Sequence, residues 1–135
     1  MKSEYGKFGG AETVKLINSA GMSITLCALG AGIMSITVAD RDGVAREMTR
    51  LDDGGYANAY HGLTIGRTSG RIANAEFTLD GNTATLEKNN YGTDNLHGGK
   101  DGLHGKIFSM RLENNDKYTD VVFGYDSPDG EGGYF

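Results

Sequence analysis

The sequence predicts an all-β fold of the sandwich or barrel kind. Apolar residues recur at every second position, as at Met34, Ile36 and Val38, which is typical of a pleated strand with one face on a core. Glycine accounts for 22 of the 135 residues, more than twice the usual ~7%, so the chain is rich in turns. The Asp80-Gly81 pair is typical of a tight hairpin, because both residue types tolerate a positive φ.

The first predicted strands lie in the N-terminal third of the chain. Residues 22–29 and 34–38 both alternate between apolar and polar side chains, and Gly30-Ala31-Gly32 separates them. We therefore expect two neighbouring strands that pair. Residues 44–51 give the one helical indication, but the segment is too short and too poorly capped for a helix, and we expect it to be irregular.

Two hairpins are predicted further along the chain. Residues 77–86 place alternating apolar side chains on both sides of Asp80-Gly81-Asn82, which is the stronger of the two signals. Residues 108–125 repeat the pattern around a polar stretch at 114–117. With no helix of substance, these strands predict a β-sandwich or a segment of a barrel.

Composition restricts the class of protein. We expect one domain spanning residues 1–135, because the chain shows no repeat and no linker. The 13 basic and 18 acidic side chains give a net charge of −5, which disfavours nucleic acid as a partner. No apolar run approaches the ~20 residues of a membrane helix, so we expect no membrane association. Cys27 has no partner cysteine and the N-terminus lacks a signal-peptide pattern, which predicts a cytoplasmic location.

Three segments contain more glycine and polar residues than a turn needs, and the first is residues 66–74. Arg67 and Arg71 flank a glycine-serine bend there. An arginine presents five donors in a planar fork, which suits vicinal hydroxyls or a carboxylate. A surface position beside acidic neighbours explains both arginines as well, and spacing alone favours that plainer interpretation.

The second segment, residues 95–100, contains His97 followed by two glycines. Glycines leave no side chain between a ligand and the backbone, and an imidazole donates or accepts near neutral pH. A histidine that only caps a loop gives the same pattern, so the residues alone leave both interpretations open. His61, His97 and His104 lack the spacing of zinc ligands, and we expect no metal site.

The third segment, residues 127–134, holds the single proline of the chain in Pro128-Asp129-Gly130. Proline fixes φ and glycine accepts a positive φ, so the tripeptide is typical of a turn. Taken alone, the segment predicts a turn and no binding function.

In this order, the segments resemble the N-terminal part of the aldose 1-epimerase family, also called galactose mutarotases. The similarity covers nearly the whole chain from Asn18 onward, and several motifs in fixed order are more specific than any single one. The motifs that carry it are Gly62-Leu63-Thr64-Ile65-Gly66-Arg67, Gly70-Arg71-Ile72-Ala73-Asn74, Phe77-Thr78-Leu79-Asp80-Gly81, Asn95-Leu96-His97-Gly98-Gly99 and Ser127-Pro128-Asp129-Gly130-Glu131-Gly132-Gly133-Tyr134.

The resemblance implies a β-supersandwich that interconverts the α and β anomers of an aldohexose such as galactose or glucose, with no cofactor. It implies that Arg71 donates to sugar hydroxyls and that His97 is hydrogen-bonded to the bound monosaccharide. Gly70, Asn74 and Arg67 are secondary candidates for the same substrate-binding site.

Departures from the family pattern carry further expectations. The family usually has asparagine where Gly70 stands, so we expect one sugar contact to be missing or replaced by water. The family's general acid histidine and general base glutamate lie in later segments, which we expect beyond Phe135. We therefore expect no catalytic residue within this chain and no activity from it alone. The chain then resembles the front portion of a longer enzyme, an incomplete sandwich whose open edges favour a homodimer or a complementing chain.

Two other functions remain open at this point. A non-catalytic sugar-binding β-module would use the same Arg71 and His97 without any proton transfer. A protein resembling hexose-6-phosphate 1-epimerases would use Arg67 as a second basic residue, for the phosphate. A β-domain that shares only turns with the family is a plainer alternative, but turns alone do not explain the Leu96-His97-Gly98-Gly99 motif at its place in the order.

Overall fold

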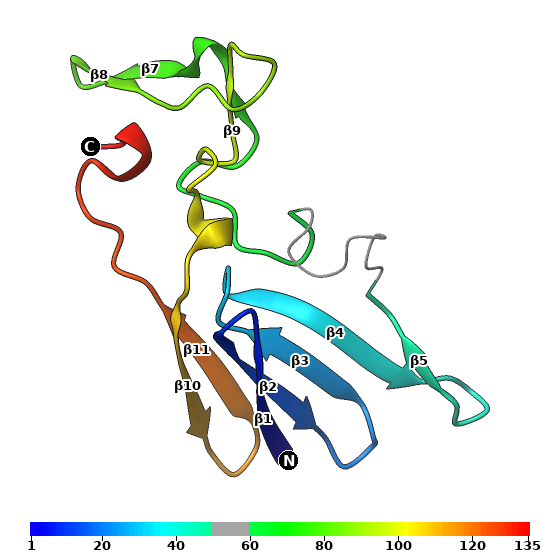
Figure 1. The fold of residues 1–135 in the computed structure, drawn as a ribbon. Helices are drawn as coiled ribbons and strands as arrows, with labels where there is room; N and C mark the ends of the chain where they lie inside the picture. The colour runs from blue at the N-terminus through cyan, green and yellow to red at the C-terminus, as the bar shows by residue number, and fades with distance from the viewer. Residues whose placement is uncertain (50–59) are drawn as a thin grey trace.

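The computed structural model describes residues 1–49 and 60–135 and shows an antiparallel β-protein (Figure 1). Its largest sheet has the order β1-β2-β3-β4-β5. These strands are β1 (Lys2–Phe8), β2 (Ala11–Ile17), β3 (Ser23–Cys27), β4 (Gly32–Ala39) and β5 (Ala45–Glu47). Three two-stranded sheets pair β6 (Arg71–Ile72) with β9 (Asn95–Leu96), β7 (Glu76–Leu79) with β8 (Asn82–Thr85), and β10 (Ser109–Asn114) with β11 (Thr119–Gly124). Three 3-10 turns, η1 (Ala73–Ala75), η2 (Leu103–Gly105) and η3 (Glu131–Gly133), complete the secondary structure of the described residues.

The predicted all-β fold and its predicted pairings are confirmed. β3 and β4 pair antiparallel, with a bulge between Thr25 and Leu26. In the β7–β8 hairpin Leu79 pairs with Asn82, and the intervening Asp80 and Gly81 have φ of 50° and 80°. Two successive positive φ values are the mark of a type I′ turn, whose twist suits a two-residue hairpin. β10 and β11 form the second predicted hairpin.

The expectation of irregular structure for residues 44–51 is wrong where β5 forms, whereas positions 50 and 51 lie outside the described residues. β5 is a short edge strand whose three residues are all exposed, so it carries no apolar alternation. Its pairing is reinforced by a side chain, since the Glu47 carboxylate accepts the N–H of Ile36 at 3.0 Å on β4.

β1 and β2 form a hairpin that the sequence analysis did not predict. Every residue of β1 is exposed, so burial leaves no periodic pattern in that strand. The signal that was available is Gly9-Gly10, because both glycines have positive φ, 54° and 85°, in the two-residue turn between Phe8 and Ala11.

In the part of the chain that the structure describes, buried side chains form two clusters. The first comprises Ala11, Cys27 and Ala28, with Leu29, Met34, Leu63 and Met110 packed against it. The second comprises Ala75, Ala84, Leu86 and Tyr134, with Ile72 and Phe77 packed against it. The first cluster joins β10 to the large sheet, and the second joins the β7–β8 hairpin to the C-terminal segment. The single-domain assignment of residues 1–135 stays a prediction.

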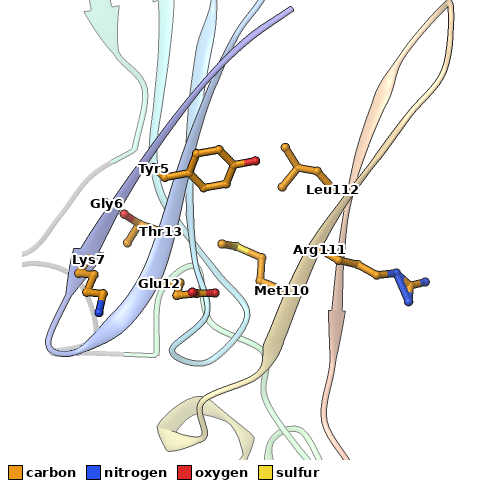
Figure 2. A pocket seen from close by; sticks show the side chains of 8 residues that line it. All are labelled: Tyr5, Gly6, Lys7, Glu12, Thr13, Met110, Arg111 and Leu112. Carbon is orange, nitrogen blue, oxygen red and sulfur yellow. The ribbon is translucent and has the colours of Figure 1, made fainter.

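The β10–β11 hairpin faces the β1–β2 hairpin and gives the molecule its sandwich-like layering. Between them runs a groove of about 440 Å³, lined by Tyr5, Gly6, Lys7, Glu12, Thr13, Met110, Arg111 and Leu112. Figure 2 shows Tyr5 and Leu112 pointing toward each other across this groove, whereas Arg111 points away from it. Among the described residues we find no helix with the length and apolar character needed to cross a bilayer.

Candidate functional site

The principal candidate residues meet at the short ladder between β6 and β9. Arg71 pairs with Leu96 in this ladder. One position further, the His97 N–H donates to the Gly70 carbonyl oxygen at 2.9 Å, and the Gly70 N–H donates to His97 Nδ1 at 3.1 Å. The structure therefore brings the first and second glycine-rich segments side by side, with Gly70, Arg71 and His97 at the junction.

The hydrogen bond from Gly70 determines which atom of His97 is available for a ligand. Because Nδ1 accepts this hydrogen bond, the neutral imidazole carries its proton on Nε2, and Nε2–H is the remaining donor. The ring is half-buried, and Tyr60 packs edge-on against it with 4.6 Å between ring centroids. Tyr60 packs in the same way on His104, at 4.8 Å.

Close packing on backbone explains Gly98, and positive φ favours glycine at both positions after His97. A Cβ on Gly98 would overlap the carbonyl oxygen of Gly66, and a Cβ on Gly99 would lie 2.8 Å from Glu87 Oε2. Both glycines also have positive φ, 85° and 92°. The loop that carries His97 therefore lies directly on the backbone of the first glycine-rich segment.

Arg71 and Asn74 lie on the exposed side of the same region. Arg71 Nε donates to Asn90 Oδ1 at 2.9 Å, so its partner differs from those of His97. Asn74 has a φ of 57°, and its backbone N–H donates to Asp94 Oδ1 at 3.1 Å. The contact recorded for Asn74 is thus made by its backbone.

Arg67 points to the third glycine-rich segment. Its Nε and Nη2 both donate to Ser127 Oγ, at 3.0 and 2.9 Å, and Nη2 also donates to the carbonyl oxygens of Ser127 and Pro128, at 3.2 and 2.6 Å. The guanidinium lies 5.8 Å from the centre of the Tyr134 ring. A phosphate at Arg67 would have to compete with these internal acceptors, so this geometry does not favour the hexose 6-phosphate alternative.

Glu131 is a residue of this region that the sequence analysis did not single out. Its carboxylate accepts hydrogen bonds from the Ser127 hydroxyl at 2.5 Å and the Tyr125 hydroxyl at 2.6 Å, and Lys106 Nζ lies 2.9 Å from Oε1. The Ser127 hydroxyl, then the Tyr125 hydroxyl and Lys106, lower the pKa of Glu131 to about 2. Tyr125 and Ser127 lie six and four residues before Glu131, whereas Lys106 comes from the segment after η2, so the sequence around Glu131 does not reveal the complete set of partners.

His104 is the second imidazole of the region. Burial, followed by the nearby His97, lowers the pKa of His104 below its ordinary value, while Asp101 opposes that shift. Its Nδ1 is buried and has no hydrogen-bond partner among the described residues. Within the part of the chain that the structure describes, no three His, Cys, Asp or Glu side chains gather into a group that could hold a metal ion.

Phe135, beyond which the sequence analysis expects the general acid and base, has an apolar role. Its ring lies 6.0 Å from the ring of Phe77, beside the second buried cluster, and about half of the residue, 51%, is exposed. A phenyl ring has no proton to transfer, so Phe135 is not itself a candidate site residue. The expectation of proton-transfer groups beyond Phe135 stays a prediction.

The fold and the junction of Gly70 with His97 together define a class, an antiparallel β-sandwich protein whose polar site is built by loops at the ends of short strands. The family model described as aldose 1-epimerase matches residues 12–135, and the chain belongs to the aldose 1-epimerase family. The resemblance seen in the sequence motifs is therefore confirmed.

Individual relatives agree with this assignment. The aldose 1-epimerase of Escherichia coli (strain K12) is 36% identical over 123 residues, which cover 88% of this chain and 34% of that protein. The galactose mutarotase of Bos taurus is 36% identical over 131 residues, which cover 93% of this chain and 37% of that protein. The chain thus spans about a third of the length of the curated relatives it matches.

Solved structures show the same fold. The crystal structure of galactose 1-epimerase from Lactobacillus acidophilus NCFM superposes with a TM-score of 0.75 at 21% identity, covering 97% of this chain and 40% of that one. An aldose epimerase homologue from C. elegans gives a TM-score of 0.72 at 24% identity, covering 98% of this chain and 38% of that one.

Proposed function

We propose that this chain supplies part of the sugar site of an aldose 1-epimerase, which interconverts the anomers of an aldohexose such as galactose or glucose. The observation that carries the proposal is the reciprocal hydrogen bonding of Gly70 and His97, which puts Arg71 at the adjacent ladder position. Family membership and the relatives named as an aldose 1-epimerase and a galactose mutarotase support the reaction class.

The two principal side chains have donors suited to sugar hydroxyls. His97 offers Nε2–H, because Nδ1 is already occupied by Gly70. In the Arg71 guanidinium, Nε has a hydrogen-bond partner among the described residues, Asn90, and the two terminal NH₂ groups have none there. Both NH₂ groups are therefore left to bind a sugar. Hydrogen bonds that involve a charged group contribute about 1.5–3 kcal/mol each. Gly70 and Asn74 are secondary members of the proposed site, whereas the Arg67 guanidinium donates to Ser127 and Pro128.

The proposed division of labour assigns binding, not proton transfer, to this chain. Opening a pyranose ring requires a base for the anomeric hydroxyl proton and an acid for the ring oxygen, each worth ~10²–10⁴ in rate. We assign neither role to Arg71 or His97, which orient the sugar.

We place the protein in the cytoplasm, on the ground that Cys27 has no second cysteine to pair with.

Titration calorimetry or NMR with galactose and glucose tests the proposal. The chain should bind a hexose. Arg71→Ala should weaken that binding about ten- to hundredfold, because it removes a hydrogen bond from a charged group, and His97→Ala about two- to tenfold, because it removes one from a neutral imidazole. Arg111→Ala is the matched control, because Arg111 is an exposed strand arginine that pairs with Glu113 and points away from the groove.

Polarimetry on freshly dissolved α-glucose provides the second measurement. The chain alone should leave the rate of mutarotation at its uncatalysed value. The proposed sugar site is wrong if no hexose binds, or if both variants bind as tightly as Arg111→Ala does. The proposed division of labour is wrong if the chain alone accelerates mutarotation.

A further inference from the structure

We propose that Arg67, Ser127 and Glu131 form a positioning relay that holds His97 in place from both sides of its loop. In this interpretation Arg67 acts on the candidate sugar site through Ser127 instead of touching the sugar. The inference rests on the proposed function for the nature of the ligand, although the contacts that define the relay do not depend on it.

The relay begins with one hydroxyl that bonds in both directions. Ser127 Oγ accepts from Arg67 Nε and Nη2 at 3.0 and 2.9 Å, and it donates to Glu131 Oε2 at 2.5 Å. Residues 60 positions apart in the chain are thereby joined through a single side chain. Removing the hydroxyl would disconnect the guanidinium from the carboxylate.

The far end of the relay is anchored by two more groups. Glu131 Oε1 accepts from the Tyr125 hydroxyl at 2.6 Å and pairs with Lys106 Nζ at 2.9 Å. The side chains of Lys106 and Glu131 are only 25% and 17% exposed, so water competes less with this pair than with a surface pair. Because Lys106 follows η2 directly, the carboxylate ties the third glycine-rich segment to the chain that leaves the His97 loop.

Backbone contacts connect the relay to His97 itself. A Cβ on Gly98 would strike the carbonyl oxygen of Gly66, the residue before Arg67. A Cβ on Gly132, the residue after Glu131, would lie in van der Waals contact with the carbonyl oxygen of Gly98, at 3.5 Å. Arg67, Gly98 and Glu131 also line one small hollow. The residue after His97 is therefore confined between the two segments that the relay joins.

The other side of His97 depends on the same bend. Gly70 lies three residues after Arg67, and its N–H is the donor that fixes His97 Nδ1. If the relay holds the bend at Arg67, it also holds this donor. Loosening the relay should therefore open the Gly70 hydrogen bond and free the imidazole.

Amide hydrogen exchange of Gly70 and the ¹⁵N chemical shift of His97 Nδ1 test the relay without any sugar present. Glu131→Gln and the milder Ser127→Ala should each accelerate exchange of the Gly70 amide at least about tenfold, and both should move the Nδ1 signal. Ser127→Ala keeps the measurement decisive if Glu131→Gln folds poorly, since it leaves Glu131 paired with Lys106 and Tyr125.

Glu47→Gln is the matched control. Glu47 also accepts from serine and threonine hydroxyls, Ser35 and then Thr49, which lower its pKa to about 2, but it lies on β5. Its replacement should leave Gly70 exchange and the Nδ1 signal unchanged. The relay is overturned if Glu131→Gln and Ser127→Ala behave like Glu47→Gln. Accelerated exchange in a chain that binds no hexose supports the relay and refutes the sugar site.

Discussion

Replacing Gly98 by alanine should destabilise the chain far more than the same change at Gly92. Both glycines have positive φ, 85° and 73°, so alanine at either position carries the backbone strain of about 1–2 kcal/mol. None of the residues that the structure describes lies within 4 Å of a Cβ on Gly92, whereas a Cβ on Gly98 would overlap the Gly66 carbonyl oxygen and lie 3.0 Å from the Arg67 backbone nitrogen. Relieving such a contact by moving backbone typically costs a further 1–3 kcal/mol or so.

Urea unfolding followed by circular dichroism measures this difference. Gly92→Ala should lower the free energy of unfolding by about 1–2 kcal/mol, and Gly98→Ala by roughly 2–5 kcal/mol. Because the strain term is common to both variants, the difference between them isolates the packing of the His97 loop on Gly66. Equal losses in the two variants would refute the close approach of these two backbones.

The remaining predictions concern acid stability, a buried amide and association. The folded pKa of Glu131, about 2, lies below its ordinary 4.5, so the stability that its carboxylate contributes is complete above pH 4.5 and is lost as pH falls toward 2. The urea midpoint of Glu131→Gln should therefore decline less than that of the wild type across this pH range, and parallel curves would contradict this. Asn95 is 1% exposed and its Nδ2 donates to the Glu87 carbonyl oxygen at 2.8 Å, so Asn95→Asp should lower the free energy of unfolding by more than about 2 kcal/mol. Asn115→Asp should cost little, because the side-chain oxygen that accepts from Lys117 N–H is kept, and equal costs would contradict the prediction. Sedimentation should show a concentration-dependent dimer, because β1 and β5 are sheet edges in the described structure, and a monomer at every concentration would count against that.

The sequence predicted those parts of the fold in which side-chain alternation and turn chemistry agree. Asp80-Gly81 with apolar residues on both sides led directly to the β7–β8 hairpin, and the alternation around Met34 led to β4. β1 and β5 were missed because all their residues are exposed, so pairing leaves no trace in the pattern of apolar positions. Edge strands of this kind are held by backbone hydrogen bonds and local side-chain contacts such as Glu47 with Ile36.

The candidate site was predictable only through the family resemblance. His97 and Arg71 are separated by 25 intervening residues, and neither segment alone indicates that Gly70 bonds to the imidazole. The relay through Glu131 was missed for a physical reason, because the contacts of Arg67 with Ser127 and of Lys106 with Glu131 exist only when distant segments meet. A local pattern such as the turn at residues 128–130 does not indicate which distant segments come into contact.

The order of strands in the large sheet has a consequence for how the molecule assembles. Each of β1 to β5 pairs with its nearest neighbour in sequence, so every closure in that sheet spans a short loop. Arg67 and Ser127, by contrast, meet across 60 residues. Since contacts that close short loops form faster than contacts that close long ones, we expect the sheet to fold early and the region around His97 to fold last. A newly made chain would then acquire its scaffold well before it acquires any affinity for a ligand.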